Sequence, residues 1–271
     1  MKNRSKTILV LLLLIFLVYI YIYLKSSGSL ELFEMIRRND YTIFSKIDIT
    51  NMLKEKVNVF MVIDYVPEIS CLFIPLFSVF MAGIYYETLN KSIKYRIGRR
   101  SDYFKFKRYY RFKFSIVSSL LINLPLLVLL LIVYSYNNSL LIPYSIGDLG
   151  ELKNYGDSFT FLVEDNIRLL FYSIVVNFLI YSFVCNYFSL ISIEKVKDIK
   201  ILLILIILSI YIVPFIGSNL FNLDSILFIP SENFIWERDY FKGNLLFNLC
   251  YPYLLFVLIY FGVHKFSNED I

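Results

Sequence analysis

The chain has few of the groups that enzymes use for chemistry. Its single histidine, His264, follows an apolar run and precedes Lys265, a position where an amphipathic side chain usually anchors a helix at a membrane surface. The sequence contains no His-Glu-x-x-His, Cys-x-x-Cys or Gly-x-Ser-x-Gly motif, which excludes the usual forms of zinc proteolysis, dithiol redox chemistry and serine hydrolysis. We therefore expect no enzyme, and we assign no catalytic, metal-binding or cofactor-binding residue to this chain.

The sequence also has few cysteines and lacks a nucleotide-binding motif. The three cysteines, Cys71, Cys185 and Cys250, lie in apolar runs, and an odd number of buried thiols gives no disulfide framework. A Gly-x-x-x-x-Gly-Lys-Ser/Thr phosphate loop is missing from the sequence. If ATP drives this protein, another polypeptide must bind the ATP.

Charged residues are few, and several long stretches of the sequence contain none. Only 18% of residues are charged, against about a quarter in average soluble domains. A helix needs roughly 20 mostly apolar residues to cross a bilayer. Six runs approach that length without a Lys, Arg, Asp or Glu, at 8–24, 69–86, 114–134, 169–191, 201–217 and 244–263. These runs predict an all-α membrane protein, a single transmembrane domain over residues 1–271 with six transmembrane helices.

The charge of the connecting segments predicts the orientation. Basic residues exceed acidic ones in the N-terminal tail, in residues 87–113 and in residues 192–200, whereas acidic residues exceed basic ones in residues 25–68, 135–168 and 218–243. Basic segments stay on the cytoplasmic side of a membrane. Both termini are therefore expected to be cytoplasmic.

Two outer segments are more than simple connections. Residues 25–68 form an outer loop or subdomain, and apolar residues there predict two short amphipathic helices, one with Leu30, Phe33, Met35 and Ile36 and the next with Met52, Val57 and Phe60. Residues 218–230 follow the fifth span, and they form either a re-entrant helix or a loop at the headgroups.

The spans lack an acid or base that could bind a coupling ion near the midplane. Their most polar side chains are Asn123, Asn177, Asn186 and Asn248. These asparagines either join helices by hydrogen bonds or line a polar transport path.

Residues 87–113 combine ten basic side chains with a regular aromatic pattern. We expect one helix from Thr88 to Ile97, a break at Gly98, and a second helix that starts near Ser101 and Asp102 and continues over Tyr103–Lys113. The second helix either lies on anionic lipid with its rings at the headgroups or docks a cytoplasmic partner. Nucleic-acid binding is not expected, because no groove-reading motif is present.

The six spans, the missing nucleotide motif and the sequence from Tyr95 to Phe104, YRIGRRSDYF, resemble the membrane subunits of type-2 ABC exporters, in particular the small permeases of bacteriocin-immunity and peptide-export systems. The architectural likeness covers nearly the whole chain, and the residue-level likeness covers about twenty positions in the basic loop. The long first outer loop departs from the family pattern.

The resemblance implies that residues 87–113 form a cytoplasmic coupling loop that docks on an ATPase subunit. Its expected coupling residues are Glu87, Lys91, Lys94, Arg96, Gly98, Arg99, Arg100 and Tyr103. It further implies a bacterial cytoplasmic membrane location, a homo- or heterodimer with a second permease, and export of an amphipathic peptide, bacteriocin or lipid-like cargo. The alternative is a non-transporting immunity or sensor protein that binds a ligand through residues 25–68. An intramembrane enzyme is a third, less favoured class.

Overall fold

A computed structural model describes residues 2–38, 45–90, 100–137, 171 and 174–208. The described residues are almost entirely helical, and no strand occurs among them. The all-α prediction is therefore confirmed for this part of the chain. Within these described ranges, three helical segments are long and apolar enough to cross a membrane, namely Arg4–Ser26, Lys105–Tyr136 and Phe178–Val196, and a shorter apolar helix covers Leu72–Thr88. The predicted span at 201–217 is described only as far as residue 208, and the span at 244–263 lies outside the described residues.

The chain divides into two compact units. The first comprises Met1–Ser70, Asn123–Val175 and Phe234–Gly243, and the second comprises Cys71–Ile122, Val176–Asn233 and Asn244–Ile271.

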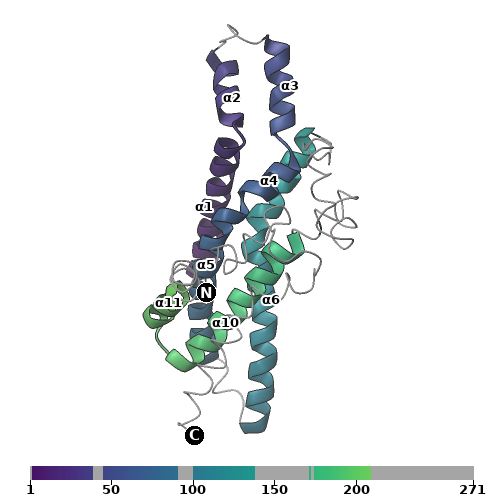
Figure 1. Cartoon of the computed structure of the whole chain (residues 1–271). Helices are drawn as coiled ribbons and strands as arrows, with labels where there is room; N and C mark the ends of the chain where they lie inside the picture. The colour runs from purple at the N-terminus through teal and green to yellow at the C-terminus, as the bar shows by residue number, and fades with distance from the viewer. Residues whose placement is uncertain (1, 39–44, 91–99, 138–170, 172–173, 209–271) are drawn as a thin grey trace, which may run out of the picture. The chain divides into compact units, whose positions relative to one another are not determined.

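The first unit is built on helix α1. Its helices are α1 (Lys2–Ser26), α2 (Ser29–Arg38), α3 (Lys46–Lys56) and α4 (Val59–Tyr65). Helix α1 contacts α2 and α4, and α2 lies beside α3 (Figure 1). Leu9, Leu13 and Leu17 on α1 are each more than half exposed. Such an apolar face is unusual on a soluble monomer and suits contact with lipid.

The short helices of residues 25–68 have clear local causes. Gly28, with φ +70°, makes the turn between α1 and α2, where a residue without a Cβ adopts the left-handed region at no cost. Ser45 caps α3 in a reciprocal capping box with Asp48. The sequence prediction of two helices is confirmed for α2 and α3. It missed that the second helix ends at Lys56, and that Val59 starts a separate helix, α4.

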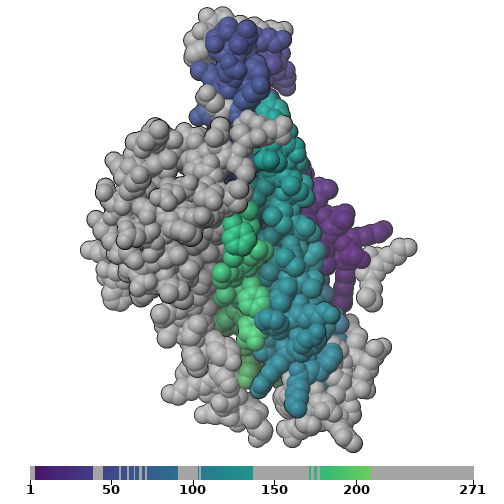
Figure 2. All heavy atoms as spheres, turned by 90° about the vertical axis from the view of Figure 1, so that its right-hand side faces the viewer, coloured from purple at the N-terminus to yellow at the C-terminus, as the bar shows by residue number. Residues whose placement is uncertain are grey.

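The second unit contains parts of three apolar helices. They are α5 (Pro67–Thr88), α6 (Arg100–Asn137) and α10 (Tyr181–Val196), which follows a π-helical segment, η3 (Ile174–Ile180). In this unit α6 and α10 lie side by side, as the teal and green atoms of Figure 2 show. The rings of Phe112 on α6 and Phe183 on α10 meet edge to face, with their centroids 5.7 Å apart. The Asn186 amide of α10 donates a hydrogen bond to Ser119 Oγ of α6 at 3.4 Å.

A tight turn joins α10 to α11 (Ile199–Ile207). Lys197 ends α10 in the left-handed conformation, with φ 61°, and the side chain of Asp198 accepts a hydrogen bond from the Lys200 N–H to cap α11. At Gly83 of α5 the absence of a side chain lets Ile199 approach closely. Ile199 of the hairpin thus lies against α5 at this point.

Candidate functional site

In the second unit the carboxylate of Glu194, on α10, contacts side chains of α5 and α6. Its Oε1 accepts hydrogen bonds from the Tyr85 hydroxyl at 2.6 Å and from Arg111 Nε at 3.2 Å. Its Oε2 accepts from Arg111 Nη2 at 2.6 Å and forms an ion pair with Lys107 Nζ at 2.9 Å. We call Tyr85, Lys107, Arg111 and Glu194 the Glu194 cluster. It joins three helices through one side chain.

Local sequence explains how α6 supplies two cations to one point. Lys107 and Arg111 are four residues apart, so they lie on the same face of the helix. The guanidinium binds both carboxylate oxygens through its planar fork, a geometry that lysine cannot reproduce. Arg111 therefore provides orientation, and Lys107 adds charge.

The cluster is substantially buried. The exposed fractions of its side chains are 7% for Glu194, 15% for Arg111 and 21% for Lys107. Buried charges persist in proteins when each is paired and hydrogen-bonded, because an unpaired one is costly to desolvate. Both oxygens of Glu194 are occupied by donors, which favours a structural ion pair over a general base.

Aromatic side chains wall the cluster on two sides. The Tyr85 ring stacks on Tyr110, with centroids 5.5 Å apart, and lies 5.4 Å from Phe114. The Arg111 guanidinium lies 5.9 Å from the centre of the Tyr187 ring, within cation–π range. Tyr110 and Phe114 of α6 thus pack against α5.

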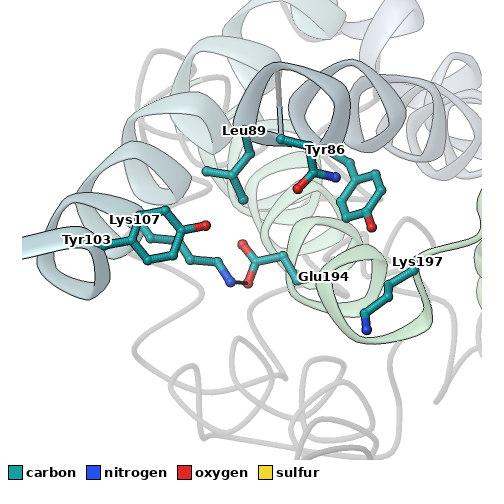
Figure 3. A pocket seen from close by; sticks show the side chains of 7 residues that line it. Tyr86, Leu89, Tyr103, Lys107, Glu194 and Lys197 are labelled. Atoms are coloured by element: carbon teal, nitrogen blue, oxygen red, sulfur yellow. Dashed lines mark ion pairs between the residues drawn. The ribbon is translucent and has the colours of Figure 1, made fainter. Parts of the chain in front are cut away.

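A pocket opens beside the cluster (Figure 3). Its volume is about 390 Å³, and it is lined by Tyr86 from the end of α5, Leu89 and Asn90 just after α5, Tyr103 and Lys107 from α6, Glu194 from α10, and Lys197. In Figure 3 Lys107 and Glu194 point toward each other, and a dashed line marks their ion pair. Partial burial and the nearby charge of Glu194 raise the pKa of Tyr103, so its hydroxyl stays protonated and can donate.

The structure places some of the expected coupling residues near this pocket. Tyr103 lines it, Glu87 is exposed in the last turn of α5, and Arg100 is the first residue of α6. The other five, Lys91, Lys94, Arg96, Gly98 and Arg99, lie outside the described residues. Most of the expected helix from Thr88 to Ile97 lies there too, and the second expected helix, Tyr103–Lys113, forms part of α6.

Of the four asparagines, Asn123 and Asn186 are buried, at 3% and 0% exposure. The Asn186 amide donates to the Ser182 carbonyl and to Ser119 Oγ, which favours the interpretation that it joins α6 to α10. Its Oδ1 has no hydrogen-bond partner among the described residues, so a polar path also stays open as an interpretation. Asn177 lies in η3, and Asn248 falls outside the described residues.

Sequence reasoning missed the Glu194 cluster. Glu194 follows the predicted span 169–191 and was counted among the charges of a short inner loop. The one available signal was the four-residue spacing of Lys107 and Arg111, which indicates a common target but does not identify it.

Searches of protein-family models, of curated proteins and of solved structures found no match for this chain.

Proposed function

We propose that this chain is the permease subunit of a type-2 ABC exporter in a bacterial cytoplasmic membrane. In this proposal it has six spans and cytoplasmic termini, and it works as a homo- or heterodimer with a separate ATPase. It exports an amphipathic peptide, a bacteriocin or a lipid-like cargo and performs no bond chemistry itself.

The observation that supports a coupling role best is the position of the Glu194 cluster. The loop that resembles a coupling element connects α5 to α6, and the cluster ties both of these helices to α10. A displacement of the loop would therefore move three apolar helices together. Rigid packed elements of this kind are what transmit a local displacement over distance.

In the proposed mechanism, ATP-driven closure of the partner pushes the loop, and the helices joined by the cluster tilt as a unit. The cargo leaves between two permeases as the access of the path alternates from inside to outside. ATP binds only to the partner subunit, which agrees with the missing phosphate loop.

Co-purification of the tagged chain from its native membrane tests this function. We expect an ABC ATPase to be recovered with the wild type and lost with Glu87→Ala and with the triple variant Arg96/Arg99/Arg100→Ala. The matched control is Arg37/Arg38→Ala on α2, which removes two arginines from the expected outer segment and should retain the ATPase. Failure to recover any ATPase with the wild type, under conditions that preserve other membrane complexes, would reject the exporter.

An immunity or sensor protein is the second candidate, and the structure of residues 29–65 favours it specifically. The described residues of this segment, 29–38 and 45–65, contain helices α2, α3 and α4, and Phe33 and Ile47 expose apolar side chains at 43% and 72%. Such side chains suit a protein or peptide ligand. Under this function, Phe33→Ser and Ile47→Ser should abolish protection against the ligand, whereas the loop variants should leave it intact.

A further inference from the structure

We propose that the pocket beside the Glu194 cluster binds a phosphate group, presented by the headgroup of an anionic phospholipid. This inference requires only that the chain sits in a membrane. It holds for the exporter and for the alternative function alike.

The charge balance of the pocket favours an anion. Of the charged side chains that line the pocket, Lys107 and Glu194 form an ion pair, and Arg111, which does not line the pocket, binds the same carboxylate from behind it. Lys197 therefore leaves one positive charge in excess at the pocket wall. The nearby carboxylate of Asp198 does not line the pocket, and it accepts the Lys200 N–H at 2.8 Å.

The polar groups of the pocket match the oxygens of a phosphate, which only accept hydrogen bonds when fully ionised. The Lys107 ammonium carries three protons that can be donated, and Glu194 Oε2 lies 2.9 Å from its Nζ on one side. The hydroxyls of Tyr86 and Tyr103 and the amide of Asn90 add further donor groups to the wall. Leu89 supplies an apolar surface on which the carbon atoms of a headgroup can rest.

The location suits a lipid. Tyr86 lies near the end of the apolar helix Leu72–Thr88, Tyr103 precedes the apolar segment Lys105–Tyr136, and Lys197 follows the segment Phe178–Val196. A pocket where three apolar helices end lies at the depth of the headgroups, and basic pockets between such helices are known to hold anionic headgroups. A volume of about 390 Å³ accommodates a headgroup.

The test measures lipid binding to the purified full-length chain in detergent by native mass spectrometry. The probes are phosphatidylglycerol, phosphatidylcholine and inorganic phosphate. The key variant is Lys197→Asn, because asparagine tolerates the left-handed backbone at this position and the fold should persist. The matched control is Lys200→Gln, which removes the same charge from an exposed residue that does not line the pocket.

We expect phosphatidylglycerol to bind more tightly than phosphatidylcholine. Lys197→Asn should weaken this binding about fivefold, the typical effect of one basic residue near anionic lipid. Lys200→Gln should change it by less than about twofold. Tyr103→Phe should weaken it as well, because it removes one donor from the wall.

Other results would overturn the proposal in distinguishable ways. An equal loss in Lys197→Asn and Lys200→Gln would show diffuse surface attraction and no pocket. Binding of inorganic phosphate that depends on Lys197, without preference between the two lipids, would keep the phosphate site and reject the lipid as its source. None of these readouts requires an ATPase, so failure here and failure of the proposed function are separate outcomes.

Discussion

Among individual residues, Glu194 has the greatest structural consequence, since it holds side chains from positions far apart in the chain. Tyr85 precedes it by 109 residues and Arg111 by 83. Replacing such a carboxylate lowers the stability of the fold strongly, because its cationic partners then remain buried without a counter-charge. The native arrangement itself need not add much stability relative to a fully apolar packing.

Glu194→Gln should destabilise the protein by about 3 kcal/mol or more, because it leaves Lys107 and Arg111 without their counter-charge. Thermal unfolding in detergent measures the loss. In a double-mutant cycle with Arg111→Leu, the combined loss should be smaller than the sum of the two single losses by about 1 kcal/mol or more. Strict additivity would show that the two residues do not interact.

Tyr85→Phe should cost about 1.5 kcal/mol, since it removes one hydrogen bond to a charged group and keeps the stacking on Tyr110. Tyr109→Phe, at a side chain that is 64% exposed, is the control and should change the unfolding temperature little. Equal effects of the two substitutions would argue against the bond between Tyr85 and Glu194.

At the scale of elements, the sequence predicted the helical class and most helix positions in the described part. Charge-free runs located α1 and α5 closely, because burial in lipid imposes a strong and local constraint on composition. The run 169–191 overlaps η3 and α10, but α10 continues beyond it to Val196. The ends of the helices were harder to predict from the sequence. Helix α6 continues without a break from Arg100 through Lys113 to Asn137, since charged side chains are compatible with a helix that extends beyond the hydrocarbon.

The contact of α5 with α11 depends on Gly83. A Cβ there would overlap Cδ1 of Ile199, which is the flexible end of its side chain. Gly83→Ala should therefore cost about 1 kcal/mol or less, whereas Gly83→Leu should cost about 2 kcal/mol or more by forcing the helices apart. Comparison of the unfolding temperatures tests this, with Ile84→Leu on the same helix as the control. Equal stability of the two Gly83 variants would mean that the close approach is absent.

The turn between α10 and α11 also has a testable backbone requirement. Lys197→Gly should raise the stability by up to about 1 kcal/mol, because glycine adopts φ 61° without the steric cost of a Cβ. The same substitution at Lys195, inside the last turn of α10, should lower it by about 0.5–1 kcal/mol. If both substitutions destabilised the protein alike, Lys197 would not be left-handed. A stabilised Lys197→Gly that binds less phosphatidylglycerol would separate binding from folding.

For the whole molecule, the candidate site could not be derived from the sequence, because it arises from packing between distant segments. Glu194 lies three residues beyond the last residue of a predicted span, and charge counting places it with Lys195 and Lys197 as a solvated group. Its burial results from Tyr85 and Arg111 on two other helices. Periodicity reports which face of a helix is apolar, and it does not report which distant side chain meets that face.

The proposed contact of the α5–α6 connection with a cytoplasmic ATPase can be measured by photocrosslinking in living cells. A photocrosslinking amino acid is placed at Glu87, which is exposed at the end of α5, or at Ile47, which is exposed on α3. We predict a crosslink from position 87 to an ABC ATPase and none to it from position 47. A crosslink from position 47 to an external protein or peptide, with no ATPase captured at position 87, would contradict the exporter and establish residues 25–68 as the functional surface.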